Sequence, residues 1–512
     1  MPVLATAALA ATPIIAILVL MLVLGWSAAR AGLAGLALAA LIAVPAFGFG
    51  DAAPGLAASA LGVAAEGGFV ALTILWILLP ALALHEHQQR SGAINALRAG
   101  LGRLSGQRPL QALLVGWFVA LFFEGAAGFG TPVALTAPLL VGLGLPPLQA
   151  VVLALLGHAV GVSFGALGTP VLAQASLTGI DAIAIAWRTA ALHAALGALM
   201  MVFFVRTLAA AGAAPGWGWA AAAAAGFLLP SLAIAATLGP ELATLGAALL
   251  GAALFALVLY WRREGPAALP AALPAALPAA LPATSASPWR ALAPYAVLVA
   301  LVLATRALTP LADALSVLEL SWQLPGGFHG SVQPLRHPGT LLLLSLLIGA
   351  RLQGVRLRTL GPAFAASARQ LLPVTVALLA MLALSRLMLH AGMVGALEQA
   401  AVQGLGRAWP LVAPAVGALG SFVTGSATAS NVLFTTLQAQ TAQALGLAPV
   451  AMVAAQGFGA AIGNIVCPHN VVAGAATVGL AGREGEVLRR VAGPCALILV
   501  AGGLLVALLA LA

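Results

Sequence analysis

The chain has 512 residues, of which 62% are hydrophobic and 6% are charged, and its mean hydropathy is +1.11. Soluble domains carry about 25% charged residues, so this composition excludes an ordinary soluble protein and predicts a polytopic membrane protein. The formal net charge of +9 comes with 21 basic residues, all arginine, which gather between apolar runs. That pattern reports membrane orientation and requires no nucleic-acid partner.

Apolar runs along the chain predict membrane helices, since roughly 20 apolar residues cross a bilayer. No charged region precedes the first run, so we expect a retained helix there and no cleaved signal peptide. The predicted runs are 3–26, 31–49, 56–84, 110–145 (broken), 148–180 (broken), 187–205, 216–237, 241–260, 291–308, 339–350, 371–392, 410–447 (broken), 450–480 (broken) and 492–511.

Arginine-rich segments predict the orientation, because such segments stay in the cytoplasm. Counting crossings from them places the N-terminus outside. The first broken region then enters from the cytoplasm and its later counterpart enters from outside, so the two halves have opposite topology. The predicted cytoplasmic segments are 85–109, 261–290, 351–369 and 483–490, and the predicted external ones are 309–338 and 393–409.

A Pro-Ala-Ala-Leu repeat runs from Pro266 to Pro282. Proline at every fourth position breaks helical hydrogen bonding, so we interpret 261–290 as a cytoplasmic linker between the halves. A membrane-surface segment is the alternative.

The stretch Phe122-Phe-Glu-Gly-Ala-Ala-Gly-Phe-Gly-Thr-Pro132 lies between apolar runs 110–123 and 133–145, each too short to span a bilayer. Such a pattern predicts a broken helix or a re-entrant hairpin, whose unwound backbone must line a cavity or be buried in protein. Thr131-Pro132 is typical of a helix start, with Thr131 as N-cap. Glu124 lies just before the break, and an intramembrane acid there indicates a functional site.

The same layout returns 300 positions later in Phe422-Val-Thr-Gly-Ser-Ala-Thr-Ala-Ser-Asn431. A second break follows in each half, at Gly165-Ala-Leu-Gly-Thr-Pro170 and at Gly463-Asn-Ile-Val-Cys-Pro468. Paired interruptions in corresponding halves are a sequence indicator of a transporter binding site.

Helix starts at Thr131-Pro132, Thr169-Pro170, Ser430-Asn431 and Cys467-Pro468 would expose free N–H groups and a partial positive charge, which suit a small anion. Ordinary Pro/Gly kinks are the alternative. The candidate substrate-binding residues are Gly128, Gly130, Thr131, Thr169, Thr424, Gly425, Ser426, Thr428, Ser430, Asn431, Arg386 and His469.

Candidate proton-coupling residues are Glu124 and His158. Burial favours a protonated Glu124, which makes it a candidate carrier, although a structural acid bonded to the opposite break is the alternative. His158 and His469 lie beside the second breaks and titrate in a useful range, but each is also typical of a satisfied bundle residue.

Arg386 lies inside the run 371–392, and an arginine in a membrane must find a partner. It either holds a substrate carboxylate or pairs with an acid. Glu66, inside the third run, is interpreted as a bundle acid or as lying near an interface.

No cofactor or metal is expected. The i, i+2 spacing of His85 and His87 does not put both rings on one helical face, so we interpret this pair as the polar start of a cytoplasmic loop. The Gly-rich breaks lack the Gly-Lys-Ser/Thr ending of a P-loop, so ATP is not indicated, and an ion gradient or facilitation remains.

These motifs resemble the lactate permease family, which includes glycolate permeases. The matching blocks are Glu124-Gly-Ala-Ala-Gly-Phe-Gly-Thr-Pro132-Val-Ala, Thr424-Gly-Ser-Ala-Thr-Ala-Ser-Asn431-Val-Leu-Phe434 with Leu437-Gln-Ala, and Val478-Gly-Leu-Ala-Gly-Arg-Glu484. The resemblance spans the membrane portion. It implies proton-coupled uptake of L-lactate, D-lactate or glycolate across a bacterial cytoplasmic (inner) membrane.

Four positions depart from the family pattern. Family members usually read Thr-Gly-Ser-Asp-Thr where this chain has Ala427, and tend toward Ser-Pro-Gln where it has Cys467-Pro468-His469. Arg386 is also outside the family pattern. These changes bear on substrate choice and proton coupling.

We therefore predict an all-α polytopic membrane protein with two inverted repeats, each with a re-entrant hairpin and a broken helix, plus scaffold helices, as the resemblance also implies. The predicted function is proton-coupled symport of a short 2-hydroxy monocarboxylate. The alternative is a sodium- or proton-coupled carrier of another small organic anion such as a dicarboxylate, with any Na⁺ bound by carbonyls near Ser426 and Asn431. An intramembrane enzyme is poorly supported, because the chain has neither an HExxH motif nor a nucleophile elbow. A channel or a sensor is a further alternative, and it differs from a carrier because it would show no saturable counterflow.

The predicted division of the chain follows the breaks. The parts are 1–109 (scaffold helices and cytoplasmic loop), 110–181 (first hairpin and broken helix), 182–260 (helices closing the first half), 261–290 (linker), 291–409 (scaffold helices), 410–482 (second hairpin and broken helix) and 483–512 (cytoplasmic segment and last helix).

Overall fold

The computed structural model describes residues 3–22, 24, 26–93, 107–128, 130–262, 288–480 and 483–511. They are helical almost throughout. Within these residues nine helices are long and apolar enough to cross a membrane, and the bent pair Pro147–Ala159 and Val162–Thr178 is a candidate for a further, broken span. The prediction of a helical polytopic membrane protein is confirmed, and the opposite orientation of the two repeats stays a prediction.

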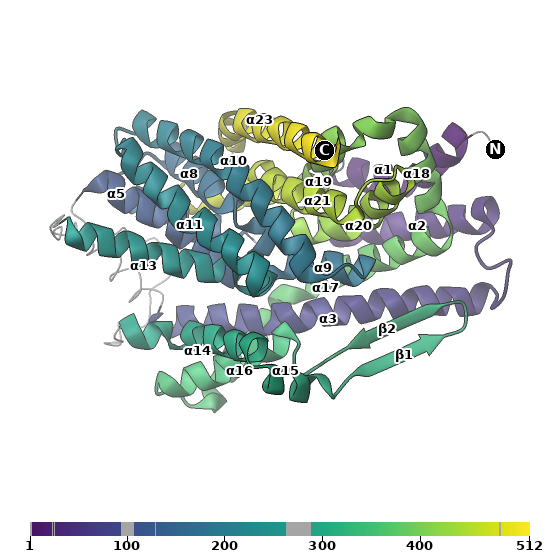
Figure 1. Ribbon diagram of the computed structural model, residues 1–512, viewed down its shortest axis with the longest axis horizontal. Helices are drawn as coiled ribbons and strands as arrows, with labels where there is room; N and C mark the ends of the chain where they lie inside the picture. The colour runs from purple at the N-terminus through teal and green to yellow at the C-terminus, as the bar shows by residue number, and fades with distance from the viewer. Residues whose placement is uncertain are drawn as a thin grey trace.

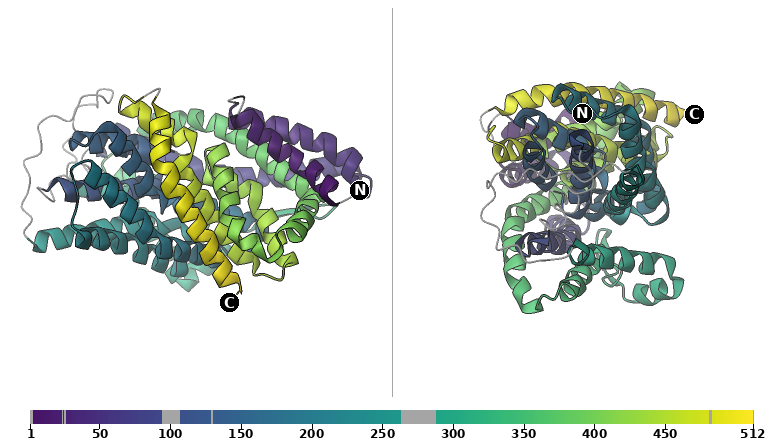
Figure 2. Two further views of the ribbon diagram at one scale, coloured as in Figure 1. Left: turned by 90° about the horizontal axis from the view of Figure 1, so that it is seen from above. Right: turned by 90° about the vertical axis from the view of Figure 1, so that its left-hand side faces the viewer.

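A layer of helices lies beneath the rest of the molecule (Figure 1; Figure 2, right). Its longest member has 35 residues, or roughly 52 Å, which exceeds the hydrocarbon thickness of about 30 Å. The layer consists of α3 (Leu56–Arg90), α14 (Pro288–Ala307), α15 (Thr309–Ser316) and α16 (Pro338–Leu352). The His85 and His87 side chains lie inside α3, so the loop predicted to begin at 85 begins later.

A β-hairpin runs along the first half of α3 and was missed from the sequence, which predicted only an external segment there. Strands β1 (Leu320–Leu324) and β2 (Phe328–Val332) pair antiparallel, and Gly326 and Gly327 make the turn with positive φ. Phe328 is buried against Gly62 of α3, and the Trp322 and Phe69 rings meet edge to face. The hairpin is therefore packed onto α3 and does not form a loose loop.

Helix α17 joins this layer to the N-terminal helices, because it packs against both α3 and α2. Its 30 residues begin at Gly361, so the helix extends the predicted run 371–392 toward the N-terminus into the arginine-bearing segment 351–369, including Arg369. The group consists of α1 (Val3–Leu22), α2 (Ala28–Phe47), α17 (Gly361–His390) and α18 (Met393–Gly404).

Two segments with the same order of elements form the centre. The first contains α5 (Arg108–Leu113), a π-helical stretch (Leu114–Val119), α6 (Ala120–Ala126), α7 (Thr131–Gly142), α8 (Pro147–Ala159) and α9 (Gly165–Thr178). The second contains α19 (Trp409–Thr424), α20 (Ala427–Ala444), α21 (Pro449–Gly463) and α22 (Pro468–Thr477).

The first arm of the first hairpin corrects the prediction of a half-length run. Arg108–Ala126 is one continuous stretch of 19 residues, long enough to cross a membrane, and is almost wholly buried within the protein. It therefore packs among other helices and not against lipid.

The remaining helices cover the central segments. They are α10 (Ala182–Ala210), α11 (Trp217–Thr237), α12 (Pro240–Ala243), α13 (Leu245–Trp261) and α23 (Glu484–Leu511). The main apolar core runs from α5 to α8 and is closed by α10, α11 and α13. The linker predicted at 261–290 falls mostly outside the described residues.

Candidate functional site

The first break separates α6 from α7. Gly128 and Gly130 have φ of +61° and +77°, which end α6 and set the start of α7. Gly130, and not the predicted Thr131, is the N-cap of α7, because the chain turns through a left-handed residue there. Glu124 lies in the last turn of α6 and is buried.

The second break bends α8 against α9 by 59°. Ala166, Leu167 and Gly168 all adopt left-handed conformations, with φ of 42°, 59° and 78°. Regular helix resumes at the predicted Thr169, whose Oγ1 donates to the Ala166 carbonyl at 2.5 Å. Left-handed backbone at two non-glycine residues costs about 1–2 kcal/mol each and is concentrated at ligand sites.

Glu124 lies against this second break. A Cβ at position 165 would lie 2.0 Å from the Glu124 Oε1, so only glycine allows the carboxyl group to approach. No basic nitrogen lies within 4 Å of Glu124 among the residues described.

The third break separates α19 from α20 and corrects a prediction. Helix α20 begins at Ala427, four residues before the predicted start at Ser430-Asn431. Ser426 is its N-cap and accepts from the Ala429 N–H at 3.4 Å, after Gly425 turns with φ +77°. The sequence predicted a start at Ser430-Asn431, but the turn at Gly425 and the cap at Ser426 start the helix earlier.

The fourth break lies between α21 and α22. Helix α22 starts at Pro468 with Cys467 as N-cap, as predicted. Asn464 follows the end of α21, and the Asn470 side-chain amide contacts its Oδ1.

All four breaks meet at one narrow cavity of about 30 Å³, room for about two water molecules. Six predicted site residues line it: Glu124, Gly128, Gly130, Gly425, Ser426 and Thr428. The helix starts of α7, α9 and α20 therefore face the same space.

Four predicted binding residues have their side chains bonded elsewhere. The Thr169 hydroxyl donates to the Ala166 carbonyl of its break, the Thr424 hydroxyl donates to the Gly420 carbonyl of α19 at 2.8 Å, and Ser430 donates to the Gly417 carbonyl at 2.7 Å. The Asn431 amide donates to the Pro170 carbonyl at 3.2 Å. These residues hold the cavity wall and do not line it.

The two histidines differ. His158 is buried next to the cavity, with Nδ1 2.8 Å from the Ala154 carbonyl and Nε2 3.4 Å from Asn464 Oδ1. His469 is exposed at the start of α22, with its ring close to Gly130. Thr131 is the first residue of α7, and its side chain is outside the described structure.

Asn464 was missed as a site residue, together with Gly165 and Ala166. The signal for Asn464 was present: a polar amide directly after an apolar helix, inside a break already recognised. The role of Gly165 depends on Glu124, 41 positions away, and no local pattern reveals it.

Contacts between the two segments hold the breaks in place. The Gln174 amide donates to the Val453 carbonyl at 2.7 Å, and the Ser163 hydroxyl donates to the Gly457 carbonyl at 3.0 Å. The broken helices of the two segments are thus bonded to each other.

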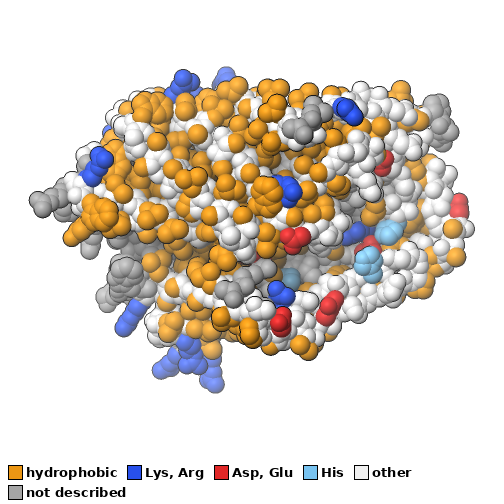
Figure 3. All heavy atoms as spheres, viewed as in Figure 1, with side chains coloured by type: hydrophobic (Ala, Val, Ile, Leu, Met, Phe, Trp, Pro, Cys, Tyr) orange, Lys and Arg blue, Asp and Glu red, His pale blue; other side chains and the backbone are white. Residues whose placement is uncertain are grey.

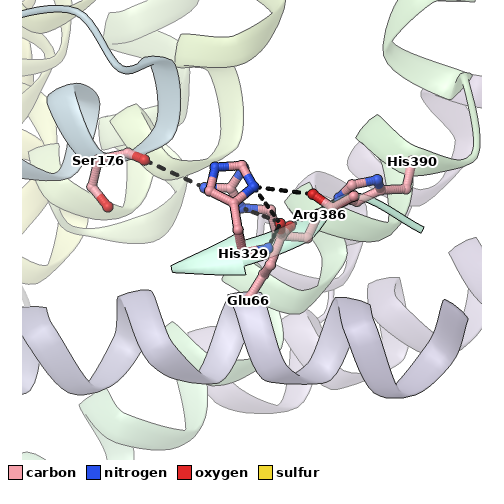
Figure 4. Close-up of polar contacts among 6 residues, drawn as sticks. Glu66, Ser176, His329, Arg386 and His390 are labelled. Carbon is pink, nitrogen blue, oxygen red and sulfur yellow. Dashed lines mark hydrogen bonds and ion pairs between the residues drawn. The ribbon is translucent and has the colours of Figure 1, made fainter. Parts of the chain in front are cut away.

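Arg386 lies in a separate cluster (Figure 4). Its Nε is 3.8 Å from the Glu66 carboxylate, and its guanidinium donates to the Ser176 carbonyl of α9 at 3.4 Å. The His390 Nε2 lies 2.8 Å from the Glu66 Oε2. The backbone N–H of His329 in β2 donates to the Glu66 Oε1 at 3.0 Å. The structure therefore places Arg386 with an acid and away from the cavity. Glu66 is a bundle acid.

This cluster belongs to a polar face. Figure 3 shows histidine, acidic and arginine side chains along the hollow between the α3 layer and the main bundle. A cavity of about 460 Å³ on the same side is lined by residues of α3, α9, α12 and β2, among them Ser176 and Glu241.

A multi-pass helical protein whose paired helix breaks meet at one small polar cavity is a membrane transporter. The chain belongs to the L-lactate permease family: the sequence model of that family matches residues 6–512. The family consists of permeases and not enzymes.

Named relatives cover most of the chain. The glycolate permease GlcA of Escherichia coli strain K12 is 30% identical over 81% of this chain and 80% of its own length. The L-lactate permease of the same strain is 28% identical, with 84% of each chain covered. The solved structure of the YdaH transporter of Alcanivorax borkumensis is similar in fold, with a TM-score of 0.52 at 17% identity over 92% of this chain and 97% of that one.

Proposed function

We propose that this protein is a proton-coupled symporter of a short 2-hydroxy monocarboxylate, namely L-lactate, D-lactate or glycolate, in a bacterial cytoplasmic membrane. The names of its relatives support the substrate class. The observation that carries the proposal is the single cavity on which the helix starts of both segments converge beside Glu124.

The helix starts provide the anion site. The first backbone N–H groups of α7, α9 and α20 have no helical partners and carry a partial positive charge, so they stabilise a carboxylate. Thr428 and Asn464 at the cavity wall supply side-chain donors for the carboxylate or the 2-hydroxyl group.

A monocarboxylate suits this wall better than a dicarboxylate. Among the residues that the structure describes, no arginine lines the cavity, and Arg386 is bound to Glu66. Backbone dipoles match one negative charge, whereas a second charge in the same apolar surroundings requires a further cation.

Glu124 is the proposed proton carrier. It is buried at the cavity wall without an ion-pair partner among the described residues, so desolvation favours the neutral acid. A protonated Glu124 beside a bound carboxylate leaves the site with one net negative charge, matched to the helix starts.

The cavity must widen before it accepts substrate. Its 30 Å³ holds about two water molecules, whereas a hydroxy acid has at least five heavy atoms. Binding therefore requires the breaks of the two segments to separate, which fits an alternating-access carrier.

The test is uptake of labelled L-lactate into proteoliposomes with an inward proton gradient, an inward sodium gradient, or neither. We expect saturable accumulation with the proton gradient alone, and competition by glycolate. Accumulation driven only by sodium would replace proton coupling with the sodium alternative, and an absence of counterflow would contradict a carrier.

A further inference from the structure

A third cavity, lined partly by polar and partly by apolar residues, lies away from the transport cavity, at the edge of the helical bundle. It measures about 290 Å³ and is formed by the start of α8, the end of α10 and the second turn of α23. Its lining residues come from helix ends, so the cavity lies where these helices leave the hydrocarbon layer. By the arginine pattern this is the cytoplasmic side.

Two arginines and two polar side chains line one part of this cavity: Arg206, Arg490, Gln149 and Thr207. Neither arginine has a carboxylate within 4 Å among the residues that the structure describes. The nearest acid along α23, Glu486, is engaged by Arg483 at 2.8 and 2.9 Å. The cavity thus carries two arginine side chains that form no ion pair within the described part of the chain, and Figure 3 shows arginine side chains on the edge above α10 and the start of α23.

The other part of the lining is apolar, with Phe203 and Pro494 among its residues. From Pro494 the same face of α23 continues through Leu497, Leu504 and Leu508, at spacings of three to seven residues, and these three side chains are 50–69% exposed. One helix face therefore runs from a cationic end to an exposed apolar stripe.

We propose that this cavity binds an anionic phospholipid of the inner leaflet. Arg206 and Arg490 hold the headgroup phosphate, assisted by Gln149, and the acyl chains lie along the apolar face of α23. Cationic pockets between helices on the cytoplasmic side are suited to such headgroups. Arginine binds phosphate in a bidentate geometry, whereas a soluble anion would make no use of the apolar stripe.

The site joins two parts of the molecule. Helix α8 belongs to the first central segment, and α10 and α23 cover the bundle. A lipid held by all three therefore ties a transport segment to its surroundings, independently of which anion the transport cavity accepts.

Native mass spectrometry of the full-length protein, released from nanodiscs of phosphatidylglycerol and phosphatidylcholine, tests the proposal. We expect one retained phosphatidylglycerol molecule. Each arginine contributes about 1 kcal/mol, so the Arg206→Gln/Arg490→Gln variant should bind phosphatidylglycerol about 30-fold more weakly. Arg206→Lys/Arg490→Lys keeps the charge but loses the bidentate geometry, so it should bind phosphatidylglycerol more tightly than the glutamine variant and more weakly than the unchanged protein, which separates charge from folding defects.

Arg489→Gln is the matched control. This exposed arginine is adjacent to Arg490, bonds to the Gly485 carbonyl and does not line the cavity. If the control and the double variant lost equal amounts of lipid, the binding would depend only on the general basic charge of this surface, and the proposed site would be wrong. Equal retention of phosphatidylcholine, or displacement of the lipid by inorganic phosphate at equal phosphate concentration, would overturn it as well.

Discussion

Glu124 and Gly165 lie in contact where two breaks of the first segment meet, and the carboxyl group occupies the space of a missing side chain. This contact aims the acid at the cavity. The two residues therefore lead to different predictions: Glu124 is tested as the proton carrier, and Gly165 is tested as the residue that positions the Glu124 carboxyl group.

Glu124→Gln should retain exchange of internal for external lactate but lose accumulation driven by a proton gradient, because the amide cannot carry the proton. Both are measured in proteoliposomes. Glu86→Gln is the control, since Glu86 is paired with Arg90 at 2.7 Å on the polar end of α3. Unchanged proton-driven accumulation in Glu124→Gln would remove this residue as the carrier.

Gly165→Ala should displace the Glu124 carboxyl and reduce uptake at least tenfold with little loss of thermal stability. The group that must move is the end of a flexible side chain, so the fold tolerates the methyl group. Gly218→Ala in α11, where a Cβ meets nothing within 4 Å, is the control. If uptake in Gly165→Ala equals that of the control, the contact has no role in transport.

Arg386 and Glu66 give a third test, because the sequence left the role of Arg386 open between substrate and acid. Arg386→Gln should lower the free energy of unfolding by about 1–3 kcal/mol and leave the KM for lactate unchanged, since the guanidinium does not line the cavity. A double-mutant cycle with Glu66→Gln should show coupling of about 0.5–3 kcal/mol in thermal unfolding. A raised KM without coupling would instead assign Arg386 to the substrate.

At the scale of single elements, the breaks depend on backbone conformations that only their neighbours enforce. Three consecutive left-handed residues in α9 are held between Glu124 on one side and Pro240 of α12 on the other. Local sequence predicted that this helix is broken there. It did not predict that Ala166 and Leu167 share the left-handed conformation with Gly168.

Two glycines, Gly168 within α9 and Gly179 directly after it, separate the effect of backbone conformation from the effect of a close contact. Gly168 and Gly179 both have positive φ, but a Cβ on Gly168 would lie 2.7 Å from the Pro240 backbone, whereas one on Gly179 meets nothing within 4 Å. Gly179→Ala should cost about 1 kcal/mol in thermal unfolding, the price of left-handed backbone. Gly168→Ala should lower the free energy of unfolding by about 2 kcal/mol more than Gly179→Ala, because the Pro240 backbone must shift. Equal decreases in the two variants would show that α12 does not hold the break.

The β-hairpin is the element that sequence reasoning missed. Alternation in Leu320–Leu324 and the Gly326-Gly327 pair are typical hairpin signals, but they stand in a chain dominated by apolar helices. Its strands are only five residues long and a lone hairpin is marginally stable, so packing against α3 is what stabilises it.

At the scale of the whole molecule, orientation is the testable quantity. Ser321→Cys in β1 should react with a membrane-impermeant maleimide on intact cells, and Thr359→Cys, within the arginine-rich segment 351–369, only after permeabilisation. The native Cys467 and Cys495 are buried, so they give a low background. The reverse labelling pattern would invert the predicted topology and place the proposed lipid site on the outer face.

The membrane class, the paired breaks and the position of Glu124 beside the first break could be read from the sequence alone. Apolar length and Gly/Pro interruptions act locally, through the cost of burying unpaired backbone in a bilayer, so they are visible without a fold. The relative orientation of the two halves rests on the arginine pattern and remains a prediction.

Only the tertiary structure decided which polar side chains face the cavity. Ser426 faces it and Ser430 does not, because the start of α20 sets the helical phase of both residues. Arg386 left the list of cavity residues because its partner, Glu66, lies 320 positions earlier on α3. A side chain's direction and its partner depend on the packing of distant segments, and this information is not contained in any local stretch of the chain.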